Sequence, residues 1–243
     1  MDKIEQLQKI IDESKHIVFF SGAGVSVDSG IPDFRSQDGL YNQKYDYPPE
    51  EIISHHFYTQ NPEEFYRFYR DKMLNLEAEP NIVHKTIAQL EKQGKCLGVV
   101  TQNIDGLHQK AGSQKVYELH GSVLRNYCTH CSQFYDAEYI KNHTPLPLCE
   151  KCGHIIKPDV VLYEEGLNEA VMQGAIAAIQ SADTLIVLGT SLVVYPAAGL
   201  IHYFHGKNLV LINRDTTPYD AQCDLCIHDT FANVFPKLNV GLE

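Results

Sequence analysis

The stretch FFSGAGVSVDSGIPDFRS, residues 19–36, begins like a phosphate-binding turn and then departs from that pattern. Gly22 and Gly24 directly follow an apolar run, as in the GxGxxG fingerprint, but Val27 stands where the third glycine belongs. Pro32 interrupts the helix that should follow, and a loop with an aspartate, a phenylalanine and an arginine comes next. The turn therefore predicts a site for phosphate groups, with a simple tight turn as the alternative.

Apolar runs of strand length alternate with helix-like segments over most of the chain around this turn. Such alternation is typical of a parallel sheet flanked by helices. We expect helices at 2–14, 81–93 and 168–180, and strands at 17–20, 97–101, 116–119, 184–189, 208–212 and 225–227. The predicted fold class is α/β, a Rossmann-like parallel sheet with helices on both faces that binds ligands at the carboxyl ends of its strands.

Two segments interrupt the alternation. Residues 48–74 lack a strand signal and are rich in Tyr and Phe, which predicts helices, whereas residues 125–157 hold two cysteine pairs among turn residues. We expect these two insertions to pack together as a small lobe. The predicted domains are a Rossmann-like domain of residues 1–35, 81–124 and 158–243, and a small domain made of a helical insertion, 36–80, and a zinc-binding module, 125–157.

The cysteine pairs CTHC (128–131) and CEKC (149–152) have the spacing of a metal site. Each two-residue spacer lets both sulfurs face one ion, and four thiolates complete a tetrahedral zinc shell. We therefore predict one structural zinc, with no open position for catalysis, bound by Cys128, Cys131, Cys149 and Cys152. A third pair, CDLC (223–226), lacks a partner pair, and buried small residues are its favoured interpretation.

Polar residues stand at the carboxyl ends of several predicted strands. The segments are TQNIDGLH (101–108), ELHGS (118–122), GTS (189–191) and NRD (213–215). Taken one at a time, each segment is explained equally well as a turn or a helix cap. His120 alone is equally explained as a structural histidine. Together they predict a polar groove in which Asn103, Asp105 and His120 converge on the ligand of the glycine turn. No second strand ending in an acidic residue follows that turn, so hydride transfer is not the favoured chemistry.

The composition restricts the partners. A net charge of −11 opposes nonspecific attraction to nucleic acid or anionic lipid and suits a cationic partner such as a lysine-rich peptide. The first residues lack an apolar core of signal-peptide length, and runs such as LIVL (185–188) are far too short to cross a bilayer. We expect a cytoplasmic monomer with no nucleic-acid or membrane partner, whose seven cysteines are thiols or metal ligands.

In their order along the chain, these motifs resemble the sirtuin family of NAD-dependent protein lysine deacylases. The motifs are GAGVSVDSGIPDFRS, TQNIDGLH, ELHG, the two cysteine pairs, KPDVVLY, GTSLVVYPAA and INRDTTP, and they span nearly the whole chain. The resemblance implies a bacterial-type enzyme that uses NAD and an acyl-lysine protein or peptide. Its products would be free lysine, nicotinamide and O-acyl-ADP-ribose, and zinc would serve folding alone. The loop after the glycine turn would be the family's mobile cofactor-binding loop.

The resemblance also implies roles for individual residues. His120 would be the general base that acts on a ribose hydroxyl, and Asn103 and Asp105 would complete the catalytic set. The cofactor would be bound by Gly22, Ala23, Gly24, Val27, Asp33, Phe34, Arg35, Gln102, Asn103, Ile104, Asp105, His120, Gly189, Thr190, Ser191, Asn213, Arg214 and Cys226.

The substrate peptide would pair as a strand between segments 157–167 and 193–198. Its contacts would be Val161, Leu162, Tyr163, Val193, Val194 and Tyr195. Glu164 stands where the family commonly has glycine, and with Glu165 it would favour basic peptides. Tyr45 and Tyr47 lack the following arginine of members that prefer succinyl or malonyl lysine, so a neutral acyl group is expected.

Two other functions remain open at this point. One is mono-ADP-ribosyl transfer from NAD to a protein side chain, which also releases nicotinamide. The other is a noncatalytic zinc-bearing module that senses NAD. This alternative predicts that NAD binds without turnover.

Overall fold

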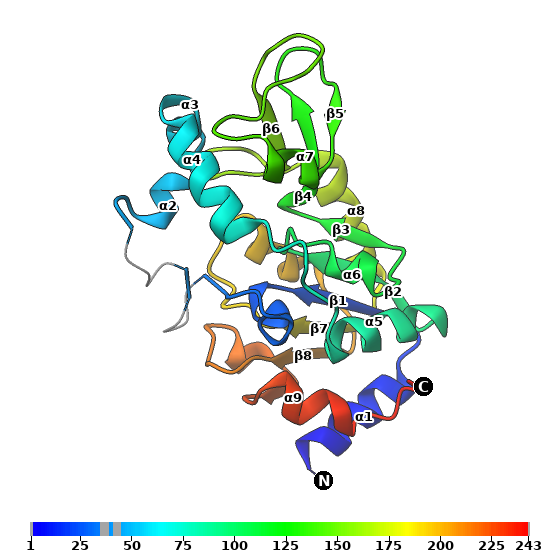
Figure 1. Ribbon diagram of the computed structural model, residues 1–243. Coiled ribbons are helices and arrows are strands. Elements are labelled where there is room, and N and C mark those ends of the chain that lie inside the picture. Colours follow the sequence, from blue (N-terminus) through cyan, green and yellow to red (C-terminus); the bar gives the residue numbers. More distant parts are fainter. Residues whose placement is uncertain (1, 35–38, 41–44, 243) are drawn as a thin grey trace.

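The computed structural model describes residues 2–34, 39–40 and 45–242. Its central sheet contains β1 (Ile17–Ser21), β2 (Cys96–Thr101), β3 (Val116–Glu118), β7 (Thr184–Leu188), β8 (Asn208–Ile212) and β9 (Leu225–Ile227). The six strands lie in the order β3-β2-β1-β7-β8-β9, and every pairing is parallel (Figure 1). This is the doubly wound order, in which the chain reverses direction across the sheet between β1 and β7. The predicted Rossmann-like sheet is confirmed.

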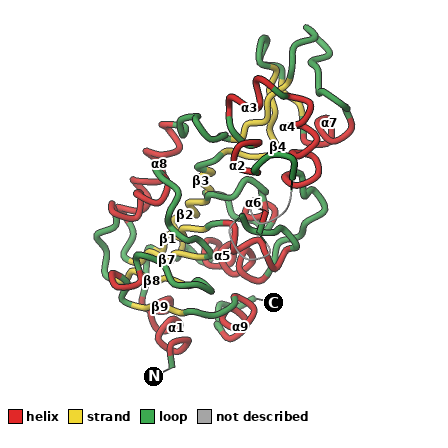
Figure 2. The backbone as a smooth tube through the Cα atoms, turned by 90° about the vertical axis from the view of Figure 1, so that its left-hand side faces the viewer, coloured by secondary structure: helices red, strands yellow, loops and turns green. Residues whose placement is uncertain are grey.

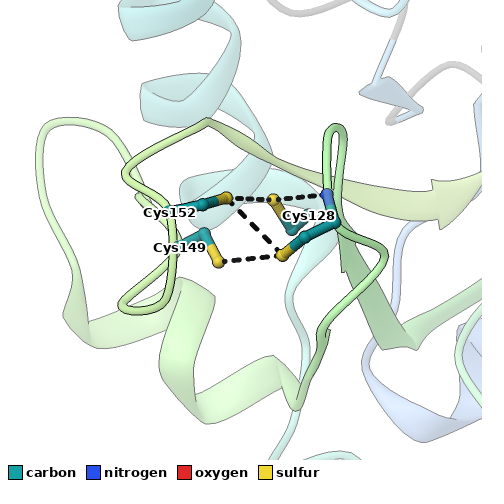
Figure 3. Close-up of side chains that lie close together, drawn as sticks. Cys128, Cys149 and Cys152 are labelled. Atoms are coloured by element: carbon teal, nitrogen blue, oxygen red, sulfur yellow. Dashed lines mark hydrogen bonds between the residues drawn. The ribbon is translucent and has the colours of Figure 1, made fainter.

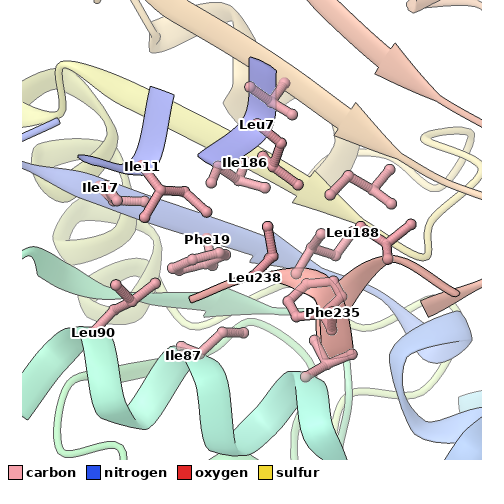
Figure 4. Close-up of a cluster of buried hydrophobic side chains, with 14 of the residues drawn as sticks. Leu7, Ile11, Ile17, Phe19, Ile87, Leu90, Ile186, Leu188, Phe235 and Leu238 are labelled. Carbon is pink, nitrogen blue, oxygen red and sulfur yellow. The ribbon is translucent and has the colours of Figure 1, made fainter. Parts of the chain in front are cut away.

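Both faces of the sheet are covered because successive side chains of each strand point to opposite sides. Ile17 and Phe19 of β1 pack with α1 (Lys3–Glu13), α5 (Ile82–Lys92), α9 (Phe231–Val234) and the 3₁₀ helix η6 (Phe235–Lys237), as Figure 4 shows. Val18 and Phe20 face α8 (Glu169–Ser181) and the 3₁₀ helix η4 (Ala197–Tyr203). In Figure 2, α8 lies on one side of the strands and α5 and α9 lie on the other.

The helices begin at the residues that the sequence indicates. The side chain of Asn81 accepts a hydrogen bond from the Val83 amide at 2.9 Å, which caps α5, and Gly94 follows that helix with φ of 75°. Asn168 caps α8 in the same way through the Val171 amide at 3.1 Å. Such caps satisfy amides at the start of a helix that have no partner within it.

The small lobe combines helices with an antiparallel sheet. The helical insertion forms α2 (Pro49–Ile52), α3 (His55–Gln60), α4 (Pro62–Phe68) and the π-helical turn η3 (Tyr69–Met73). The sheet has the order β5-β4-β6, with β4 (Gly121–Cys128), β5 (Phe134–Tyr135) and β6 (Ile156–Val160), and α7 (Ala137–Asn142) lies beside it. Phe57, Phe65 and Tyr66 of the insertion pack in one cluster with Val123 and Ile156 of the sheet.

This sheet was not predicted from the sequence, because β5 has only two residues, the buried and exposed positions of the longer β4 do not alternate regularly, and the cysteine turns lie between the strands. It also crosses two predicted domain boundaries, since β4 starts at Gly121 and β6 ends at Val160. The division into two domains therefore stays a prediction. In the described part of the chain, no helix is long and apolar enough to cross a membrane.

Candidate active site

A cavity of about 450 Å³ lies at the carboxyl ends of the central strands. It is lined by the loops after β1, β2, β7 and β8, by His120, by residues 160–165, and by Lys72, Met73 and Asn75 at the end of the helical insertion. Open α/β sheets bind ligands at this edge, next to the point where the strand order reverses. The position and size suit a dinucleotide together with part of a second substrate.

Glycines bring the loops after β1 and β7 together at that point. The Gly22 amide donates to the Leu188 carbonyl and the Gly24 amide to the Gly189 carbonyl, both at 2.9 Å. A Cβ atom on Gly24 would lie 2.8 Å from the Cα of Gly189, closer than real Cβ contacts. The chain then forms the 3₁₀ helix η1 (Ala23–Ser29) in place of the long helix of a dehydrogenase turn. The close packing of these two loops therefore requires glycine, independently of any contact with phosphate groups.

A buried polar cluster joins the first two loops. The Ser26 hydroxyl donates to Asp105 Oδ2 at 2.6 Å and accepts a hydrogen bond from Asn103 Nδ2 at 3.1 Å, while Asp105 Oδ1 accepts the Leu107 amide at 2.9 Å. Burial raises the pKa of Asp105, and the hydrogen bonds from Ser26 and Leu107 oppose that rise. Ser26 was not identified from the sequence, because neither serine of the run GVSVDS indicates a role until the fold places Asp105 beside the first of them.

His120 has a defined tautomer. Its Nδ1 lies 3.0 Å from the Gln102 carbonyl oxygen. A carbonyl can only accept, so Nδ1 carries the hydrogen and Nε2 keeps a free lone pair. Burial lowers the pKa of His120, and the hydrogen bond to Gln102 only partly offsets this effect. The imidazole is therefore neutral near pH 7 and able to accept a proton at Nε2.

Beneath the cavity, a chain of buried hydrogen bonds fixes Asn103. The backbone amide of Asn103 donates a hydrogen bond to Thr101 Oγ1 at 3.0 Å, and the Ser21 hydroxyl donates one to the same oxygen at 2.8 Å. His108 Nε2 lies 2.9 Å from the Ser21 hydroxyl and donates to it, because that hydroxyl gives its own hydrogen to Thr101. Burial, reinforced by His84, lowers the pKa of His108 to about 3, so this histidine remains neutral.

Most of the predicted site residues line the same cavity. From the predicted cofactor set these are Ala23, Gly24, Val27, Asp33, Phe34, Gln102, Asn103, Ile104, Asp105, His120, Gly189, Thr190, Ser191, Asn213 and Arg214. From the predicted peptide contacts they are Val161, Leu162, Tyr163, Val194 and Tyr195. Gly22, Val193 and Cys226 are not among the described residues that line it, and Arg35 lies outside the described residues. The individual roles stay predictions.

The segment predicted to bind the peptide is fastened to the small lobe. The Tyr163 amide donates to the Ile53 carbonyl, and the His55 amide donates to the Tyr163 carbonyl, both at 3.0 Å. His55 Nδ1 lies 2.7 Å from Glu165 Oε1, and His56 Nδ1 lies 3.0 Å from Glu164 Oε1. Each carboxylate that was expected to attract a basic peptide therefore already faces an imidazole.

The cysteine pairs meet as predicted. The sulfurs of Cys128 and Cys152 lie 3.3 Å apart and those of Cys131 and Cys149 lie 3.5 Å apart, as the close-up in Figure 3 illustrates. All four sulfurs are within 4.8 Å of one another. The Tyr135 hydroxyl donates to the Cys149 sulfur at 3.2 Å, the kind of second contact that orients a metal-bound thiolate. The donor set fits a closed, structural zinc and leaves no ligand position for a substrate.

The fold and the cavity define an α/β dinucleotide-binding protein with a separate zinc module. The model of the Sir2 family matches residues 22–196, and the chain belongs to this family.

Curated relatives and solved structures agree with this assignment. The chain is 57% identical over 237 residues to the NAD-dependent protein deacetylase of Clostridium acetobutylicum, covering 96% of this chain and 97% of the relative. It is 57% identical over 240 residues to the protein of the same name from Clostridium perfringens, covering 98% of each.

Among solved structures, a Sir2 variant with deacetylated p53 peptide and 3′-O-acetyl ADP ribose gives a TM-score of 0.90 at 39% identity, covering 97% of this chain and 96% of that one. A complex of Sir2 with p53 peptide and NAD⁺ gives a TM-score of 0.85 at 38% identity, with the same coverage.

Proposed function

We propose that this chain is an NAD-dependent protein lysine deacylase that transfers the acyl group to ADP-ribose and releases nicotinamide. The observation that carries the proposal is one cavity that holds both a histidine with a free Nε2 lone pair and the Ser26–Asp105–Asn103 cluster. The relatives' names and the NAD and acetyl-ADP-ribose complexes of the solved neighbours support it.

NAD, when bound, supplies a ribose carbon from which nicotinamide can leave. Asn103, Ile104 and Asp105 would hold the nicotinamide end, and Thr190, Ser191 and Asn213 the adenosine end, since both sets line the cavity. Phe34 and the apolar residues near it would keep water from the reacting carbon. This exclusion of water would favour attack on that carbon by the acyl oxygen of the substrate.

His120 then acts as the general base. Its Nε2 accepts the proton of a ribose hydroxyl, while the Gln102 carbonyl holds the ring by Nδ1. The lowered pKa keeps the base unprotonated before it acts. The zinc module takes no part in these steps, because its four sulfurs close the metal shell.

The acyl-lysine peptide would enter between residues 161–163 and 194–195, which line the cavity from two sides. A neutral acyl group, acetyl or longer and aliphatic, remains the proposed preference, and one solved neighbour is Sir2Tm bound to a propionylated peptide. A cytoplasmic location and a monomeric state are likewise proposed.

The test is turnover with an acetyl-lysine peptide and NAD, followed by the release of nicotinamide and O-acetyl-ADP-ribose. His120→Ala should lower the rate by about 10²- to 10⁴-fold, the usual contribution of a general base. The control is His205→Gln at an exposed histidine that does not line the cavity, and it should keep the wild-type rate.

Undiminished acyl removal by His120→Ala would refute the assigned base. Nicotinamide release with ADP-ribose attached to protein would indicate mono-ADP-ribosyl transfer instead. NAD binding with no turnover of any peptide in the panel would favour the noncatalytic alternative.

A further inference from the structure

A second group of metal-type donors lies at the far end of the sheet from the cysteine module. Asp220, Cys226 and His228 each place one ligand atom within 4.8 Å of the other two. Asp220 begins the 3₁₀ helix η5 (Asp220–Gln222), Cys226 lies in β9, and His228 follows that strand. The thiol of Cys223 lies outside this group of three, but it interacts with the thiol of Cys226 and is the candidate for a fourth ligand.

Asp220 and His228 place two potential ligand atoms side by side. His228 Nδ1 lies 3.2 Å from the Asn213 carbonyl, which can only accept, so Nδ1 carries a hydrogen. Nε2 of the same ring lies 2.9 Å from Asp220 Oδ2. With the hydrogen on Nδ1, Nε2 directs its lone pair into the space that it shares with this carboxylate oxygen, as two ligands of one ion would.

The ligand atoms are held by contacts of the kind found behind metal ligands. Asp220 Oδ1 accepts hydrogen bonds from the Thr217 amide at 2.9 Å and from its hydroxyl at 2.8 Å, which leaves Oδ2 for the ion. The Asn213 carbonyl fixes the imidazole through Nδ1. The Cys226 carbonyl accepts a hydrogen bond from Lys3 Nζ at 2.8 Å, which fastens the strand that carries the sulfur. Such outer contacts orient ligands and raise metal affinity.

We propose that Asp220, Cys223, Cys226 and His228 form a second metal site, selective for Zn²⁺ or a divalent ion of similar softness. Two sulfurs with one nitrogen and one oxygen exclude a preference for Mg²⁺ or Ca²⁺, which take oxygen ligands. Ligands of one zinc ion lie no farther apart than about twice the Zn–S length of about 2.3 Å. The ligand atoms of Asp220, Cys226 and His228 already lie within 4.8 Å of one another, and a side-chain rotation of Cys223 would bring its sulfur to the same ion.

This site differs from the cysteine cluster in exposure. The side chains of His228 and Asp220 are 30% and 25% exposed, and the two cysteines are half-buried. A metal ion at this site can exchange with solvent, so it should dissociate more readily than the zinc ion of the four-cysteine cluster. It lies behind the adenosine end of the cavity, because Asn213, whose carbonyl holds His228, and Asp229 both line that cavity.

The test uses the metal alone, without NAD or peptide, so its outcome is independent of the proposed deacylase activity. Reduced protein that holds one zinc per chain is titrated with Co²⁺, since thiolate ligation of Co²⁺ produces a charge-transfer absorption band. The wild-type protein should bind one further ion per chain with this band and retain its zinc. His228→Gln and Cys223→Ser should each weaken the added binding by about tenfold or more.

His205→Gln is the matched control, because it removes an exposed histidine away from the group, and it should titrate like the wild type. The proposal is overturned if no second ion binds, if the band persists at unchanged affinity in both variants, or if one zinc is released for each cobalt bound.

Discussion

Replacing Ser26 with alanine removes the link between the two loops that build the cavity. Ser26 is 1% exposed, so water cannot readily replace the hydrogen bonds of its hydroxyl to Asp105 and Asn103. A hydrogen bond to a charged group contributes about 1.5–3 kcal/mol, which equals about 1–2 pKa units at about 1.36 kcal/mol each. The pKa of Asp105, already raised by burial, should therefore rise further, because the lost bond had opposed that rise.

The assay is kcat/KM for NAD with a saturating acetyl-lysine peptide, measured across the acid side of the pH profile. At pH values at which the ionisation of Asp105 limits the reaction, Ser26→Ala should reduce kcat/KM by roughly 10- to 150-fold. The acid limb of the pH profile should shift upward by about 1–2 pH units. Ser29→Ala is the control, because Ser29 lies on the same 3₁₀ helix but accepts from Asn81 Nδ2 at 3.0 Å. A folded Ser26→Ala enzyme with the wild-type rate and acid limb would refute the reasoning.

Three further predictions concern other parts of the molecule. Cys149→Ser, or removal of zinc with a chelator, should lower Tm and expose the helical insertion to protease; an unchanged Tm with zinc absent would contradict a structural metal. Burial would raise the pKa of Glu165, but hydrogen bonds from His55 and the Leu162 amide and the nearby Lys157 ammonium lower it overall. This stabilisation is present above the ordinary glutamate pKa of about 4.3 and is lost as pH falls through the lower folded value, so Tm of the wild type should fall more steeply there than Tm of Glu165→Gln. Acetyl and propionyl peptides should outperform a succinyl peptide by roughly tenfold or more, because no arginine follows Tyr45 and Tyr47 to pair with a carboxylate, and Lys72, which lines the cavity, is already paired with Asp71 at 3.0 Å; a faster succinyl reaction would disprove the neutral preference.

The central sheet could be predicted from the sequence because its strands are continuous apolar runs between capped helices. Runs such as TLIVL (184–188) are buried on both faces of the sheet. Such a strand can be recognised from its apolar sequence without knowing which strands pair with it. The three strands of the small sheet could not be found in this way. In β4, exposed Leu124 and Tyr127 alternate irregularly with buried positions, and a register shift interrupts its pairing with β6.

The site could be predicted only as a set of strand ends. Asn103, Asp105 and His120 converge because parallel strands place their carboxyl ends at one edge. Their partners come from residues distant in sequence, and no local pattern indicates them: Ser26 lies 79 residues from Asp105, and His55 lies 110 residues from Glu165. These pairs depend on how the loops and lobes pack.

The strand β4 passes without interruption from the base of the cavity into the zinc-bearing lobe, and His120 stands immediately before it. Arg125 of this strand binds Glu118 at 2.7 Å, on the sheet side of that histidine, and Asp159 at 2.8 Å, on the lobe side. The backbone on either side of His120 is therefore held to both sheets. One guanidinium thus joins β3 of the central sheet to β6 of the small sheet, and the turn that carries His120 lies between the two residues, Glu118 and Arg125, that form the first of these ion pairs.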